Sequence, residues 1–165
     1  MKRILIALAV LLSVQVADAQ TKTPEAAKKA VESAEAASKD AKKAAKVATW
    51  TKLASAYMDA YNAPAGNVWL GASKQELQLI IGNEKPLSVE EVVLGGDQLV
   101  KEVYSNKEFY FSPAGQLVMI NVTRPVVEDA LGGALEAYKK AYEVDVKQSK
   151  TKDIVNGLTS IAQKY

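Results

Sequence analysis

Two stretches of the chain decide the predicted fold: residues 50–57 read WTKLASAY, and residues 134–145 read ALEAYKKAYEVD. Large apolar side chains recur in both at steps of three and four residues, which is the period of one helix face. The alanines between them let two helix backbones approach closely, while the aromatic rings fill the adjoining spaces. We therefore expect the two stretches to form helices that pack against each other as an antiparallel pair.

The spacing within these stretches resembles the two helices of a tetratricopeptide repeat (TPR). In that family the first helix carries a Trp, a Leu followed by a small residue, and a Tyr. The second helix carries small residues around an aromatic one and often ends in Asp-Pro, where this chain has Asp145-Val146. The resemblance implies that eight residues pack the pair together: Trp50, Leu53, Ala54, Tyr57, Leu131, Ala134, Tyr138 and Ala141.

The distance between the two stretches departs from the family, because a standard repeat of about 34 residues keeps its helices adjacent. Residues 62–125 lie between them and hold most of the Gly, Pro, β-branched and aromatic residues. We expect a mainly α fold of TPR-like antiparallel helix pairs, with a small α+β insertion that forms a β-hairpin or a three-stranded antiparallel element. Residues 20–165 then make a single domain, and an ordinary helical domain without repeat ancestry is the alternative.

Capping residues mark where the other helices begin. Thr23 before Pro24 starts the first helix, and Asp40 is placed to cap the second. Ser73 is followed by Glu76 at the spacing of a capping box. Gly132-Gly133, inside a later helix, indicates close approach to a neighbouring helix rather than a phosphate site. Helices are therefore predicted over residues 24–37, 41–61, 74–81, 126–144 and 153–165, with one unbroken helix over residues 24–61 as the alternative.

The clearest strand signal lies at residues 108–123, where two apolar stretches flank Ser112-Pro113-Ala114-Gly115, a sequence typical of a type I turn. In the second stretch Val118, Ile120 and Val122 share one face, which we expect to be buried. A two-stranded hairpin is marginal in water, so it must pack on helices or gain a third strand, for which Leu99–Tyr104 is the candidate. Residues 88–104 fit either helix or strand.

The first 19 residues have the three parts of a secretory signal peptide: basic Lys2-Arg3, an apolar stretch over residues 4–16, and the cleavage signal Ala17-Asp18-Ala19. We expect cleavage after Ala19, which leaves no stable transmembrane span and a formal net charge of +1. The layout resembles that of exported repeat proteins of Gram-negative bacteria, which implies a periplasmic or secreted protein. The last helix is then either a capping helix or the front of a longer repeat array.

The composition excludes several classes of function. The chain has no Cys and no His, which removes disulfides, thiolate nucleophiles, Ser-His-Asp triads and the commonest metal ligand. Its charge is close to neutral, so no broad electrostatic attraction to nucleic acid is expected. No catalytic, cofactor-binding or metal-binding residue is predicted, and we expect the protein not to be an enzyme.

These observations predict a non-enzymatic scaffold for protein–protein interaction, with a protein or peptide as its partner. Its groove would be lined by the helices over residues 41–61 and 126–144, and the inserted hairpin would add specificity. The candidate binding surface consists of Tyr104, Tyr110 and Arg124, since exposed aromatic and Arg side chains favour recognition. The alternative is a carbohydrate- or envelope-binding accessory domain that acts through the inserted element. The oligomeric state stays open.

Overall fold

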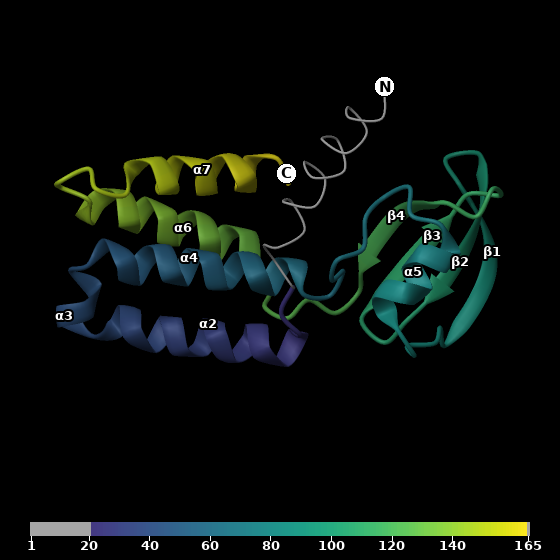
Figure 1. Cartoon of the computed structure of the whole chain (residues 1–165), viewed down its shortest axis with the longest axis horizontal. Helices are drawn as coiled ribbons and strands as arrows, with labels where there is room; N and C mark the ends of the chain where they lie inside the picture. Colours follow the sequence, from purple (N-terminus) through teal and green to yellow (C-terminus); the bar gives the residue numbers. More distant parts are fainter. Residues whose placement is uncertain (1–20, 165) are drawn as a thin grey trace, which may run out of the picture.

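The computed structural model describes residues 21–164, which form a helical layer and a sheet lobe (Figure 1). The predicted signal peptide, residues 1–19, lies outside the described residues. The helical layer contains α2 (Pro24–Lys39), α3 (Ala41–Ala44), α4 (Val47–Asn62), α6 (Ala130–Val144) and α7 (Thr151–Ala162). The sheet lobe contains α5 (Lys74–Ile81), β1 (Ser88–Leu94), β2 (Asp97–Val103), β3 (Lys107–Phe111) and β4 (Leu117–Val122).

The break between the first two helices is confirmed at Asp40. Its carboxylate accepts hydrogen bonds from the N–H groups of Lys42 and Lys43, both at 3.0 Å, and so caps α3. The helix predicted over residues 41–61 is in fact two helices, because the chain turns again at Lys46. Trp50 holds this second corner, since its indole N–H donates to the carbonyl of Ala44 at 2.7 Å.

The long helices of the layer lie side by side in the order α2, α4, α6, α7, and the chain reverses direction at each step (Figure 1). Their interfaces are built mainly from alanine, which allows the helix axes to come close together. The core of this layer contains Ala27, Val31 and Ala34 from α2, Leu53, Ala54, Ala56 and Ala60 from α4, and Ala137 from α6.

Two glycines mark the closest approaches in the layer. A Cβ atom at Gly133 of α6 would lie 2.9 Å from the ring of Tyr57 on α4. A Cβ atom at Gly157 of α7 would collide with the ring of Tyr138 on α6. Close helix packing at Gly133 is thus as predicted, whereas its neighbour Gly132 instead donates its N–H to the Asp129 side chain that caps α6.

The sheet lobe is an antiparallel meander in the order β1-β2-β3-β4, with α5 packed on one face (Figure 1). Its core is separate from that of the helices and consists of Leu77, Tyr104, Phe109, Phe111 and Leu117. The capping box that starts α5 is confirmed: the Ser73 hydroxyl accepts from the Glu76 N–H, and the Glu76 carboxylate accepts from the Ser73 N–H at 2.8 Å. Lys74 of α5 lies over the Phe111 ring at 4.6 Å.

The prediction of a mainly α fold with a small insertion is wrong. The described residues are 49% helix and 19% strand, and the strands form one four-stranded sheet with its own core, so the fold is mixed α+β. Residues 88–104, left open between helix and strand, form β1 and β2. Their signal was ambiguous because β1 is an edge strand exposed along most of its length, so it lacks the alternation of apolar and polar residues that marks a half-buried strand.

The predicted burial of the second hairpin strand also needs correction. Val118 is 44% exposed, whereas Leu117, expected on the other face, is buried. The cause is a β-bulge, since the register between β3 and β4 shifts between Tyr110 and Phe111. The bulge leaves Val118 as the extra residue between Leu117 and Met119, so Leu117 faces the core in its place, while Ile120 packs against that core as predicted. None of the helices within residues 21–164 is long and apolar enough to cross a membrane.

Candidate functional site

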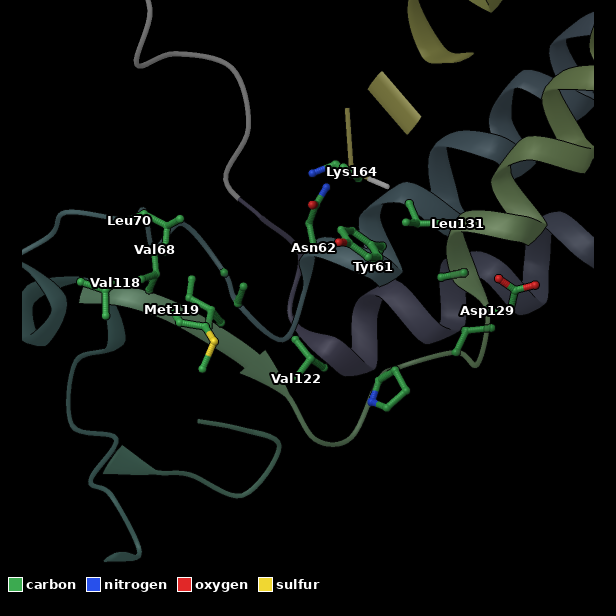
Figure 2. A pocket seen from close by; sticks show the side chains of 16 residues that line it. Tyr61, Asn62, Val68, Leu70, Val118, Met119, Val122, Asp129, Leu131 and Lys164 are labelled. Atoms are coloured by element: carbon green, nitrogen blue, oxygen red, sulfur yellow. The ribbon is translucent and has the colours of Figure 1, made fainter. Parts of the chain in front are cut away.

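A cleft of about 810 Å³ separates the helical layer from the sheet lobe (Figure 2). One wall is β4 together with Val68 and Leu70, which precede α5. The opposite wall is the end of α4, with Tyr61 and Asn62, and the start of α6, with Leu131. The cleft is thus formed where the chain leaves the helices for the sheet and where it returns, and both connecting segments contribute to it.

The first connecting segment is fastened to the sheet beyond the end of α4. Gly71 donates its N–H to the carbonyl of Leu117 at 2.7 Å, and Leu117 donates its own N–H to the carbonyl of Ala72 at 2.8 Å. The positive φ of Gly71, 90°, belongs to a backbone conformation that favours glycine. This pairing fixes Leu70 at the mouth of the cleft and covers the beginning of the β4 edge.

The second connecting segment ends at Asp129, which lines the cleft and begins α6. Its φ of 48° lies in the left-handed region, an uncommon conformation for a residue with a side chain. The Asp129 carboxylate compensates by accepting the N–H of Gly132 at 3.1 Å, as a helix N-cap does. The turn therefore fixes where Leu131 stands on the helical wall.

Exposed apolar side chains gather around this cleft. Leu70 is 61% exposed and Trp69, beside it in the chain, is 50% exposed. Val118 on β4 is 44% exposed and Tyr61 at the end of α4 is 39% exposed. Of these four, Tyr61, Leu70 and Val118 line the cleft itself, and exposed apolar side chains that share a cleft are typical of interaction sites and ligand-binding grooves. The charged side chains among the residues that line the cleft are Asp129 and Lys164, one of each sign, and the Lys164 ammonium lies 5.1 Å from the centre of the Tyr61 ring.

The structure does not bring the three predicted surface residues together. Tyr104 is buried in the core of the sheet lobe, with its ring centre 5.2 Å from that of Phe109. Burial, followed by the neighbouring Glu102 carboxylate, raises the pKa of Tyr104 above its ordinary value. Tyr110 lies on the opposite face of the sheet, and Arg124 is exposed in the segment that leads to α6.

Tyr110 takes part in a polar network on the face of the sheet that α5 does not cover. Its hydroxyl donates to Glu108 at 2.8 Å, and the Asn121 amide donates to the same carboxylate at 2.8 Å. These hydrogen bonds lower the pKa of Glu108 below its usual range. Lys101 pairs with Glu90 at 2.7 Å on the same face. The polar groups there already have partners, so this face offers few unsatisfied groups to a ligand.

The eight residues predicted to pack the helix pair lie on α4 and α6, which are neighbours. Leu53, Ala54, Ala134 and Ala141 are buried. The rings of Trp50, Tyr57 and Tyr138 are half-buried and pack against the core of the helical layer, whereas Leu131 faces the cleft. Tyr57 also donates a hydrogen bond of 2.6 Å from its hydroxyl to Glu35 on α2. Burial, and then this contact with Glu35, raise the pKa of Tyr57 to about 12.

Asp145, which stands where the TPR pattern often has Asp-Pro, organises the turn between α6 and α7. Its buried carboxylate accepts from the N–H groups of Ser149 and Lys150, both at 2.9 Å, and from the hydroxyls of Ser149 and Thr151 at 3.1 Å. Burial by itself would raise the pKa of Asp145, but these hydrogen bonds outweigh it and lower the pKa below its usual value. The carboxylate therefore holds this turn together without the proline that the family often has after the Asp.

Comparison of the chain with protein-family models, with curated proteins and with solved structures finds no match in any of the three. The resemblance to tetratricopeptide repeats therefore stays a prediction that rests on residue spacing.

Sequence reasoning missed the main residues of the cleft, Leu70 and Val118. A signal for Leu70 was present: Trp69-Leu70 is a pair of large apolar residues in a segment rich in Gly, Pro and Asn, where no core element is predicted. Large apolar side chains in such a segment are either covered by another element or available for binding. Val118 carried no such signal, because its exposure depends on the bulge.

Proposed function

We propose that the protein is an exported, non-enzymatic interaction module that binds a protein or peptide in the cleft between its helical layer and its sheet lobe. The observation that carries this proposal is that three exposed apolar side chains, Tyr61, Leu70 and Val118, line the cleft, with Leu70 61% exposed. Between α4 and α6 themselves, the Tyr57 ring packs directly on Gly133 and fills that part of the helix interface. The cleft lies instead at the sheet-facing ends of these two helices.

The ionisable groups support a binding role over acid–base catalysis. A general acid or base works best with a pKa near the operating pH. The carboxylates with shifted pKa values in the described part of the chain, Glu76, Glu90, Glu108 and Asp145, all have pKa values lowered, away from neutrality. Each accepts hydrogen bonds from neighbours that cap a helix, order a turn or link strands, so its environment is explained by structure alone.

Site-specific photo-crosslinking tests the proposal in cells that express the protein. A benzophenone amino acid at position 70 should form adducts with a partner, because this side chain stands at the mouth of the cleft. The matched control is the same replacement at Leu79, a leucine of α5 that is 85% exposed and lies outside the cleft. Leu70→Glu should weaken binding of the captured partner at least about tenfold, as expected from burying a charge in an apolar site.

The proposal is wrong if positions 70 and 79 give the same adducts, or if Leu70→Glu and Leu79→Glu bind the captured partner equally well.

The proposed export of the protein has a separate test. Mass spectrometry of the protein recovered from outside the cytoplasm should show an N-terminus at Gln20, and an intact Met1 there would contradict cleavage after Ala19.

A second candidate function, carbohydrate or envelope binding through the sheet lobe, is favoured by one residue. Trp69 precedes α5 and is 50% exposed, and a half-exposed indole offers an apolar face with a polar N–H. Titration of the protein with cell-wall glycan fragments should then quench its tryptophan fluorescence. Trp69→Ala should remove both the quenching and the binding, while Leu70→Glu leaves the binding intact. Because Leu70 lines the cleft and Trp69 is its neighbour in the chain, this difference separates a sugar from a peptide ligand.

A further inference from the structure

We propose that the cleft binds an extended, uncharged peptide segment of its partner, which adds to the free edge of β4 as a fifth strand. This inference rests on the proposed function, because it assumes that the cleft is the partner site. It adds the conformation of the ligand, the backbone groups that hold it and the chemistry of its side chains.

The backbone of β4 offers hydrogen-bonding groups along this edge. Asn106, just before β3, accepts from the N–H of Thr123 at 3.0 Å, so the two form a hydrogen-bonded pair. Moving along the strands by two residues each time, Glu108 with Asn121 and then Tyr110 with Met119 are pairs of the same type, which direct their backbone groups at each other. Because alternate residues of a strand direct their backbone groups to opposite sides, Ile120 and Val122 direct theirs away from β3. Within residues 21–164, no strand pairs with β4 on that side beyond the bridge between Ser73 and Gln116 and the contacts of Leu117.

The two edges of the sheet differ in charge, and this difference favours β4 as the binding edge. β1, at the other edge, carries Glu90 and Glu91, and charged residues on an edge strand discourage pairing with other chains. β4 reads LVMINV and carries no charge from Leu117 to Val122. An uncharged edge is open to strand addition unless another part of the protein restricts access.

The helical wall leaves the β4 edge accessible but limits how large a partner can reach it. Tyr61 and Leu131 stand across the cleft from β4 (Figure 2). The cleft between them, of about 810 Å³, is within the size range of ligand-binding clefts. The edge of a second sheet would bring side chains on both of its faces as well as its neighbouring strands. The position of the edge therefore favours a single extended chain over pairing with the sheet of a second copy.

The charge of the cleft defines the side chains that the peptide should carry. Its sheet wall includes the uncharged residues Val68, Val118 and Ile120, and its two charged residues are Asp129 and Lys164. A charged side chain in the middle of the bound segment would lose water without gaining an opposite charge nearby. Since side chains of a strand alternate between its faces, we expect uncharged apolar residues at every second position, over about five residues.

The experiment starts with selection of binders from a phage-displayed library of random 12-residue peptides on the immobilised protein. Each selected sequence is then synthesised in two N-methylated forms, one methylated at every second residue and the other at the residues between. In a strand only one of these sets of N–H groups faces β4, so one form should bind at least about tenfold more weakly than the other. A ligand held only by its side chains should not distinguish the two forms in this way.

Two variants of the protein test the same hydrogen bonds by changing the backbone of β4 instead of the peptide. Val122→Pro removes an N–H that has no internal partner, so the sheet should fold, since proline is tolerated where an edge strand faces outward. Val122→Ala shortens the side chain and keeps the N–H. Strand addition predicts that Val122→Pro weakens peptide binding about tenfold more than Val122→Ala, and equal urea midpoints for the two variants show that both are folded. Hydrogen exchange of the Ile120 and Val122 amides should slow when the peptide binds.

The possible results separate this inference from the proposed function. Peptides that need Leu70 but bind equally well in both N-methylated forms would overturn strand addition and leave the cleft as the partner site. A selection that yields no peptide, or only peptides with charged central residues, would also overturn the strand model. If the protein dimerises when a peptide is added, seen as a doubled mass of the protein in sedimentation, the strand model would also be overturned. Failure of the proposed function itself is seen separately, in crosslinking at position 70.

Discussion

Replacing Gly133 with alanine should destabilise the protein, although the same change normally stabilises a helix. Alanine in a helix interior is favoured over glycine by about 1 kcal/mol. A Cβ atom at this position, however, would lie 2.9 Å from the Cε1 and Cζ atoms of Tyr57. Real Cβ atoms essentially never approach other atoms so closely, and overpacking of a core costs about 1–3 kcal/mol. We expect a net loss of about 1 kcal/mol in the free energy of unfolding.

The loss depends on Tyr57 being held in place. Its hydroxyl donates to Glu35 at 2.6 Å, so the ring is fixed between α2 and α6 and cannot slide away from a new methyl group without breaking that bond. Tyr57→Leu removes the ring atoms that would clash while retaining an apolar side chain. In that background Gly133→Ala should recover its helix propensity and stabilise the protein by about 1 kcal/mol.

Urea denaturation monitored by circular dichroism measures both effects as shifts of the midpoint at constant slope. The double-mutant cycle should give a coupling of about 2 kcal/mol between positions 57 and 133, within the range seen for residues in contact. If Gly133→Ala stabilises the unsubstituted protein, or if its effect is the same with Tyr57 and with Leu at position 57, then the close contact does not limit the packing of α4 on α6.

Three further predictions concern groups outside the cleft. Tyr57 has its pKa raised from 10.0 to about 12, so the stability it contributes is present below pH 10 and is lost as the pH rises through 12; Tyr57→Phe should flatten the fall of the urea midpoint between these pH values. Asp145 has a lowered pKa, so its contribution is present above its ordinary pKa and is lost on acidification; Asp145→Ala should lower the melting temperature at pH 7 and reduce its further decline towards pH 2. Glu84→Ala leaves the buried Lys107 ammonium without the carboxylate 2.9 Å away, so it should lower the free energy of unfolding by about 2 kcal/mol, measured by heat or urea. Lys107→Met should lower it less, because methionine suits the neighbouring rings of Tyr104 and Phe109. Equal losses for the two variants would contradict this account.

Three helix starts were predictable because their signals are local, whereas the helix predicted from residue 126 begins only at Ala130, after the turn that ends at Asp129. Thr23, Asp40 and Ser73 cap the helices that follow them, and each acts within three residues along the chain. The wrong fold class came from β1, whose exposed edge position produces no periodic pattern that one sequence can reveal. Residues 88–94 become a strand only by pairing with β2, and their own sequence does not specify that pairing.

The cleft was less accessible to prediction than the fold, because it depends on contacts between distant segments. Leu70 reaches its position through the pairing of Gly71 with Leu117, which lie 46 residues apart in the chain. Val118 is exposed because of a bulge that is set by the register of β3 against β4. The predicted surface failed for the same reason: Tyr104 and Tyr110 are near in sequence, but they lie on opposite faces of the sheet.

The packing of the helical layer explains how the chain accommodates the whole sheet lobe between α4 and α6. The Tyr57 ring of α4 fills the space above Gly133 of α6, and the Tyr138 ring of α6 fills the space above Gly157 of α7. The same aromatic-on-glycine contact thus joins successive long helices, once across the sheet lobe and once across a short turn. Because each contact is made by side chains along the helices and not by the connecting segments, the length of the connection does not determine whether the helices pack. The sheet lobe is therefore free to present its β4 edge beside the helix ends without weakening the layer that supports it.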